Sequence, residues 1–72
     1  MRDLPFVTQE LAVHGVRVTV GLTSLGTSGW TWSFRADDGT LGMNFEAPLD
    51  TEDEAFDEAV AAAYRALHDV RG

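Results

Sequence analysis

Apolar and polar residues alternate between Trp30 and Ala47 in the pattern of a β-hairpin. The apolar positions are Trp30, Trp32, Phe34 and Ala36, followed by Leu41, Met43, Phe45 and Ala47. Asp38-Gly39 between the two runs is typical of a two-residue turn, because aspartate and glycine tolerate positive φ best. Such a turn pairs position i with position 77 − i. Every apolar residue then faces another apolar residue, as Trp32 faces Phe45 and Phe34 faces Met43.

The preceding segment, residues 10–24, is also strand-like, but its phase changes once. Leu11 and Val13 are odd-numbered, whereas the later apolar residues are even-numbered, and the change falls at His14-Gly15. An extra residue at a β-bulge returns the following side chains to the same face. We therefore expect one long bent strand over residues 10–24. The alternative is a tight turn at His14-Gly15 between two short strands.

The segment Leu25 to Gly29 is rich in turn residues and predicts a loop. If Ser24 pairs with Trp30 across this loop, the apolar residues of both strands share one face, with Leu22 opposite Trp32. The pattern therefore predicts a three-stranded antiparallel meander in the order 1-2-3, with strands at 10–24, 30–37 and 40–47. One face of this sheet is apolar and the other is polar.

The C-terminal part of the chain predicts a helix over residues 51–70. Thr51-Glu52-Asp53-Glu54 matches a capping box, with Thr51 as the N-cap residue. An apolar stripe follows at helical spacing, with alanines on its flanks: Phe56, Val60, Ala63, Tyr64, Leu67 and Val70, flanked by Ala55, Ala59, Ala62 and Ala66. We expect this helix to cover the apolar face, giving one α+β domain over residues 1–72.

Residues 1–9 are predicted to form an N-terminal arm. Leu4, Phe6 and Val7 are apolar, while Pro5 interrupts a regular element. The arm either caps the open end of the core or binds a partner, because exposed apolar clusters often mark association sites.

Composition narrows the range of partners. The 72-residue chain has a formal net charge of −7, five arginines and no lysine, so phosphate backbones and anionic lipids should repel it. No apolar run reaches the length of a membrane span. There is no cysteine and no basic stretch followed by an apolar one at the start, so we expect a cytoplasmic location without a signal peptide.

No motif indicates catalysis. His14 and His68 lack a nearby nucleophile in a recognised pattern. Gly26-Thr27-Ser28-Gly29 precedes a strand and lacks the lysine of a phosphate loop. The acidic segment from Asp50 to Glu58 lacks the glycine of an EF-hand loop. We expect no enzymatic activity, no cofactor and no metal.

Two sets of residues are candidates for partner binding. The first is on the polar sheet face, where Arg17 and Arg35 could anchor a partner and Asn44 aligns with Gly21 and Ser33. The second is the acidic start of the helix: Glu52, Asp53 and Asp57. The alternatives without a binding role are a solvated sheet surface for the first set, and helix capping with dipole complementarity for the second.

The motifs W-x-W-x-F, D-G and T-x-x-E-A, at Trp30–Phe34, Asp38-Gly39 and Thr51–Ala55, resemble those of small uncharacterised bacterial and phage-associated βββα proteins. This resemblance implies a fold and no functional residue. The order of elements is also similar to that of double-stranded RNA-binding domains and the arm-binding domains of phage-type integrases. The RNA-binding domains carry lysines where this chain has Glu52, Asp53 and Glu54, so the resemblance does not extend to RNA binding.

These patterns lead to three functional hypotheses. The first is a small non-enzymatic protein-interaction or regulatory module, including a homodimer, that binds through a sheet edge, the open face or the N-terminal segment. The second is an acidic nucleic-acid mimic that inhibits a basic partner. The third, which the charge balance disfavours most, is nucleic-acid binding through Arg17 and Arg35. Trp30 and Trp32 are expected to be core residues rather than base-stacking residues.

Overall fold

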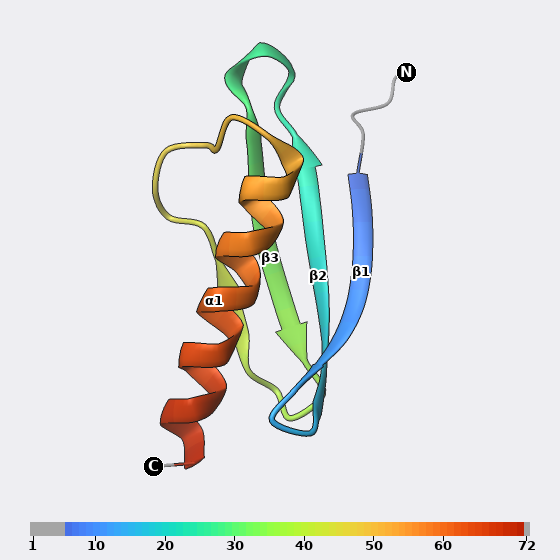
Figure 1. Cartoon of the computed structure of the whole chain (residues 1–72), viewed down its shortest axis with the longest axis vertical. Coiled ribbons are helices and arrows are strands. Elements are labelled where there is room, and N and C mark those ends of the chain that lie inside the picture. Colours follow the sequence, from blue (N-terminus) through green and yellow to red (C-terminus); the bar gives the residue numbers. More distant parts are fainter. Residues whose placement is uncertain (1–5, 72) are drawn as a thin grey trace.

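The chain folds into two layers, an antiparallel sheet and one helix that covers one face of it (Figure 1). The computed structural model describes the backbone of residues 6–71 and the side chains of residues 6–67. The elements are β1 (Phe6–Val13), β2 (Val16–Ser24), a short 3-10 turn (Gly26–Ser28), β3 (Trp30–Ala36), β4 (Leu41–Met43) and α1 (Glu52–Arg71). The α+β class is confirmed, but the predicted three-stranded sheet is wrong, because the sheet has four strands in the order β1-β2-β3-β4.

The additional strand arises at His14-Gly15, where the expected bulge is a turn. His14 and Gly15 have φ of 52° and 80°, and Val13 pairs with Val16 across them. Positive φ at both central residues matches a two-residue hairpin turn, and histidine adopts this conformation more readily than most residues. The alternative of two strands is therefore correct. Residues 6–9 belong to β1, while the rest of the predicted arm, residues 1–5, lies outside the described residues.

The predicted pairing between β2 and β3 is confirmed. Ser24 pairs with Trp30, Leu22 with Trp32, Val20 with Phe34 and Val18 with Ala36. All four pairs are buried or half-buried on the face that α1 covers. The indole of Trp32 stacks on the ring of Phe34, with ring centroids 6.3 Å apart, so the expected core role of Trp32 is confirmed.

The predicted register of the second hairpin is wrong by one residue. Ser33 pairs with Met43 and Phe34 with Gly42, so position i faces position 76 − i. The loop has three residues, because Ala36 N donates to Thr40 O at 2.8 Å and Gly39 N donates to Ala36 O at 3.0 Å. Gly39, with φ of 98°, occupies the left-handed position that follows a type I turn in such loops. Leu41 and Met43 consequently point away from α1.

The carboxylate of Asp38 stabilises this three-residue loop. Its Oδ1 accepts a hydrogen bond from Thr40 N at 2.9 Å. The hydrogen bonds from Thr40 lower the pKa of Asp38, because they favour the charged carboxylate. The turn that sets the register of β4 is thus supported by a side chain as well as by the backbone.

After β4 the chain leaves the sheet and returns at Leu49. Trp30 and Leu49 exchange two backbone hydrogen bonds of 2.8 Å, so Trp30 pairs with Leu49 and not, as predicted, with Ala47. The predicted strand 40–47 is therefore shortened to Leu41–Met43. The intervening segment forms the loop beside α1 in Figure 1.

Helix α1 begins as predicted but buries a different set of residues. Glu54 N donates to Thr51 Oγ1 at 3.1 Å, which confirms Thr51 as the N-cap. Its fully covered residues are Ala55, Ala59, Ala63 and Leu67, whereas Tyr64 is 44 % exposed and its ring packs edge-on against His14. The alanines therefore lie at the centre of the contact with the sheet and not on its flanks. Val70 belongs to a part of α1 whose side chains are outside the described residues.

This arrangement predicts that the same substitution has a large effect at one helix position and almost none at another position nearby. Ala59 is fully buried, so Ala59→Leu forces α1 away from β2 and β3 and should lower the free energy of unfolding by about 1–3 kcal/mol. Ala61 is exposed on the same helix, so Ala61→Leu should change it by less than about 0.5 kcal/mol. Urea denaturation of both variants measures the difference. Equal effects would contradict the placement of the alanine stripe.

Candidate protein-binding surface

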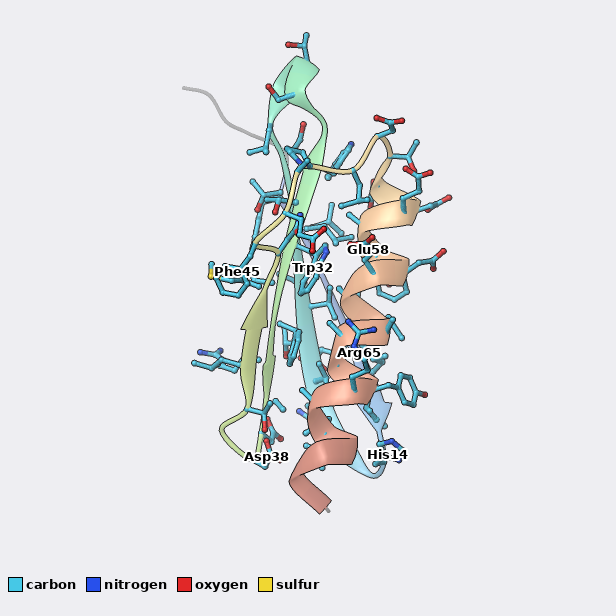
Figure 2. All side chains as sticks on the ribbon, turned by 90° about the vertical axis from the view of Figure 1, so that its left-hand side faces the viewer. His14, Trp32, Asp38, Phe45, Glu58 and Arg65 are labelled. Atoms are coloured by element: carbon cyan, nitrogen blue, oxygen red, sulfur yellow. The ribbon has the colours of Figure 1, made fainter. Side chains whose placement is uncertain are left out.

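The sheet face opposite α1 carries an exposed apolar cluster that was not predicted. The exposed fractions are 60 % for Phe6, 69 % for Leu41, 53 % for Met43 and 87 % for Phe45. Figure 2 shows Phe45 on the side of the sheet away from α1, and Trp32 on the helix side. The register of β4 places Leu41 and Met43 on the same open face, beside Arg35 and Ser33. The prediction of a flat polar face is therefore wrong along the β4 edge of the sheet.

These residues border a groove of about 610 Å³, which we call the apolar groove. Its lining on the open face consists of Phe6, Thr8, Thr19, Gly21, Ser33, Arg35, Leu41, Met43 and Phe45. The floor is low because Gly21 and Ser33 are small and pair directly with each other. The ring of Phe6 forms one wall and leans over Gly21, where its Cζ would lie 3.2 Å from an added Cβ. Residues from β4 and the following loop form the opposite wall.

Two predicted partner-binding residues, Arg17 and Arg35, lie on this open face. Arg35 lines the apolar groove, and Arg17 lies two residues before Thr19 on the same face of β2. Within residues 6–67, neither guanidinium has a hydrogen bond or an ion pair. Glu10, on β1, is the acidic side chain that shares the face with them. The sheet therefore presents unpaired positive charge next to apolar side chains.

Asn44, the third predicted residue of this face, is not on it. The corrected register puts Met43, and not Asn44, in line with Gly21 and Ser33. Its side chain holds the loop after β4, accepting from Glu46 N at 2.9 Å and donating to Ala47 O at 3.4 Å. These contacts give Asn44 a structural role.

The predicted acidic residues lie on the other layer of the molecule. Glu52, Asp53 and Asp57 are in the first turns of α1, which packs on the face opposite the apolar groove. The structure therefore does not bring them together with Arg17 and Arg35. Among the described residues, no group of three or more histidines, aspartates or glutamates is placed to hold a metal ion. Within the same part of the chain, no helix combines the length and the apolarity that a membrane crossing needs.

A second hollow, of about 460 Å³, lies between α1 and the loop that follows β4. Trp32, Asn44, Glu58 and Arg65 are among the residues that line it, and Met43 and Phe45 line both this hollow and the apolar groove. Trp32 Nε1 donates to Glu58 Oε1 at 3.5 Å, which satisfies the indole of a residue that is only 9 % exposed. The hydrogen bond between Trp32 and Glu58 thus links α1 to the sheet at this hollow.

Leu41, Met43 and Phe45 are the surface residues that the sequence did not predict, whereas Phe6 belongs to the N-terminal arm for which partner binding was one of the two alternatives. The length of the loop before β4 decides which face Leu41 and Met43 occupy. Asp37-Asp38-Gly39 fits a three-residue loop, with glycine in the left-handed position, and Asp38-Gly39 also fits a two-residue turn. The alternation of apolar residues favoured the second choice. Both choices use the same glycine, so the local sequence did not separate them.

Comparison with protein-family models, with curated proteins and with solved structures finds no match to this chain. The resemblance to bacterial and phage-associated βββα proteins stays a prediction. Any functional conclusion has to come from the surface itself.

Proposed function

We propose that this protein is a non-enzymatic interaction module that binds an apolar, acidic segment of a partner protein in the apolar groove. The observation that carries this proposal is the cluster of four large apolar side chains exposed on a sheet face next to Arg35, whose guanidinium has no ion pair within residues 6–67. Large exposed apolar patches that are bordered by polar residues commonly mark sites of protein interaction. Burying such a patch supplies the driving force for association.

The charge of the partner follows from the arginines. The guanidinium of Arg35 lies at the groove, and a carboxylate is its best-matched ligand because two parallel hydrogen bonds can form. The ring of Phe6 covers Gly21, so the room for a bulky side chain lies over the exposed Ser33, between the two walls. A segment that combines an aromatic or aliphatic anchor with one or two carboxylates fits both features. Nucleic acid fits less well, because most of the groove is apolar and the chain is strongly acidic.

Selection from a random peptide library displayed on phage tests this proposal. Peptides selected on the full chain should be enriched in aromatic or aliphatic residues next to Asp or Glu. In heteronuclear NMR spectra, a selected peptide should shift the amide signals of Gly21, Ser33 and Met43. Phe45→Ser should weaken its binding by about tenfold or more, since truncation of a central apolar anchor commonly costs at least 1–2 kcal/mol.

Matched variants separate the groove from the rest of the surface. Tyr64→Ser removes an exposed aromatic ring on the helix side and should leave peptide binding unchanged. Arg35→Gln should reduce both the affinity and its dependence on salt, whereas Arg65→Gln should do neither. Binding that maps to α1, or that survives Phe45→Ser and Arg35→Gln, would contradict the proposal.

A second candidate function is the acidic mimic of a nucleic acid. It is supported by four exposed carboxylates on two successive turns of α1, at Asp53, Glu54, Asp57 and Glu58. The two functions use opposite faces, so they can be separated. Replacing Glu52, Asp53 and Asp57 by alanine should abolish the salt-dependent binding of a basic partner in the mimic case, and should leave peptide binding in the apolar groove unchanged.

A further inference from the structure

The outer edge of β1 is an unprotected strand edge. β1 has eight residues, FVTQELAV, with one charged side chain, Glu10, and no proline, glycine or lysine. Natural proteins usually blunt a free edge with lysine, proline, a bulge or a very short strand. The other edge follows this rule, since β4 has only three residues and runs into an irregular loop. Among the described residues, no strand pairs with the outer side of β1.

The backbone groups available on that edge follow from the turn. The two-residue turn closes on the pair Val13 and Val16, and the flanking pair of such a hairpin exchanges both of its hydrogen bonds. By alternation, the odd-numbered residues of β1 direct their backbone N–H and C=O groups towards β2. The even-numbered residues direct theirs outward: Phe6, Thr8, Glu10 and Ala12.

We infer that the occupant of this edge is a second copy of the chain, which pairs antiparallel with β1 so that Gln9 faces Gln9 of the other copy. The two-fold axis is then perpendicular to the sheet and joins two four-stranded sheets into one. The outward backbone groups of even-numbered residues meet, with Phe6 opposite Ala12 and Thr8 opposite Glu10 of the other copy. On the helix side, Val7 faces Leu11. Each cross-strand pair therefore matches apolar with apolar or polar with polar.

The neighbouring registers fit less well. A shift by two residues in one direction places Glu10 opposite Glu10, and like charges directly opposite each other destabilise a strand pair. The same shift in the other direction places Phe6 opposite Glu10 and Val7 opposite Gln9. Shifts by one residue would turn the two helices to opposite faces and misalign the outward backbone groups. The side chains of β1 thus select a single symmetric register.

The position of α1 gives independent support. α1 lies over β2 and β3 and covers β1 least (Figure 1), so Val7 and Leu11 are left half-buried at the rim of the core. In the proposed dimer these two side chains pack against the same residues of the other copy. Both apolar grooves then face the side opposite the two helices and stay open, so this inference does not depend on the proposed function.

Single-cysteine variants test the register directly, because the chain has no cysteine of its own. Gln9→Cys puts two thiols at a symmetric, non-hydrogen-bonded pair, where Cα atoms are about 4.5 Å apart and within the range of a disulfide. Under mild oxidation it should form an intermolecular disulfide at least about tenfold faster than Thr8→Cys or Glu10→Cys, whose self-pairs are out of reach in this register. All three positions are exposed, so the variants should fold.

Light scattering of the unmodified chain provides a second readout. The mass should rise from one chain of 7.8 kDa towards twice that value between micromolar and millimolar concentration. Thr8→Pro removes an outward-facing N–H without affecting the pairing with β2, so it should keep the circular dichroism spectrum and remove the dimer. A monomer at millimolar concentration would overturn the inference. Equally fast disulfide formation at residues 8, 9 and 10 would also overturn it.

Discussion

Gly29→Ala should be among the most destabilising single substitutions in this protein, lowering the free energy of unfolding by about 4 kcal/mol. Two effects add at this position. Gly29 has φ of 108° and ψ of −150°, a region that only glycine occupies without strain. A Cβ at Gly29 would also overlap the carbonyl oxygen of Leu49, which pairs with the next residue, Trp30. Neither group can move without breaking the link between β3 and the segment that leads into α1.

Thermal unfolding followed by circular dichroism measures this effect, and the midpoint should fall by roughly 15–30 °C for a domain of this size. Gly26→Ala is the matched control. It lies in the same loop with φ of 70°, but a Cβ there meets nothing within 4 Å. It should therefore show backbone strain alone, about 1–2 kcal/mol. Similar losses in the two variants would mean that the contact with Leu49 contributes nothing.

The parts of the fold that sequence predicted correctly are those in which two independent signals agreed. The pairing of β2 with β3 followed from the alternation of Val18, Val20 and Leu22 and from the odd length of the loop that leads to Trp30. The start of α1 followed from the capping motif at Thr51 and from the apolar period behind it. In both cases, a shift of one residue would have exposed large apolar side chains that the sheet and helix bury together.

The errors arose where one local signal had two physical solutions. A change of phase at a glycine is consistent with a bulge and with a turn, and the positive φ of His14 decides between them only in the structure. Asp38-Gly39 likewise fits two loop lengths. The chosen pairing assumed that every apolar residue of the second hairpin must be buried, but α1 is narrow and its alanine stripe lies over β2 and β3. On the helix side of β4, the ring of Phe34 lies against Gly42, where even a Cβ would overlap it, so no large side chain fits there.

That single error hid most of the candidate binding surface. Shifting the register by one residue exchanges the two faces of β4, so Leu41 and Met43 replace Gly42 and Asn44 on the open side. Arg17 and Arg35 were correctly assigned to that side, because the β2–β3 register was correct. The charged half of the surface was therefore predictable from the sequence, whereas the apolar half depended on two turns, the loop before β4 for Leu41 and Met43 and the His14-Gly15 turn for Phe6.

Leu22→Ala and Leu41→Ala should differ in stability by about 3 kcal/mol, although the chemical change is identical. Leu22 is fully buried between α1 and the sheet, so its truncation loses transfer free energy and leaves a cavity, which together cost about 3 kcal/mol. Leu41 is 69 % exposed on the open face, and its truncation should change the free energy of unfolding by less than about 0.5 kcal/mol.

Urea denaturation at constant temperature compares the two variants, with equal m-values as the condition for reading the midpoints as stabilities. The comparison also tests the register of β4, since pairing by 77 − i would place Leu41 opposite Ala36 in the core. A loss of 2–5 kcal/mol in Leu41→Ala would then be expected, as for any buried leucine. A small loss in Leu41→Ala would instead mean that this side chain is free to contribute its apolar surface to a partner.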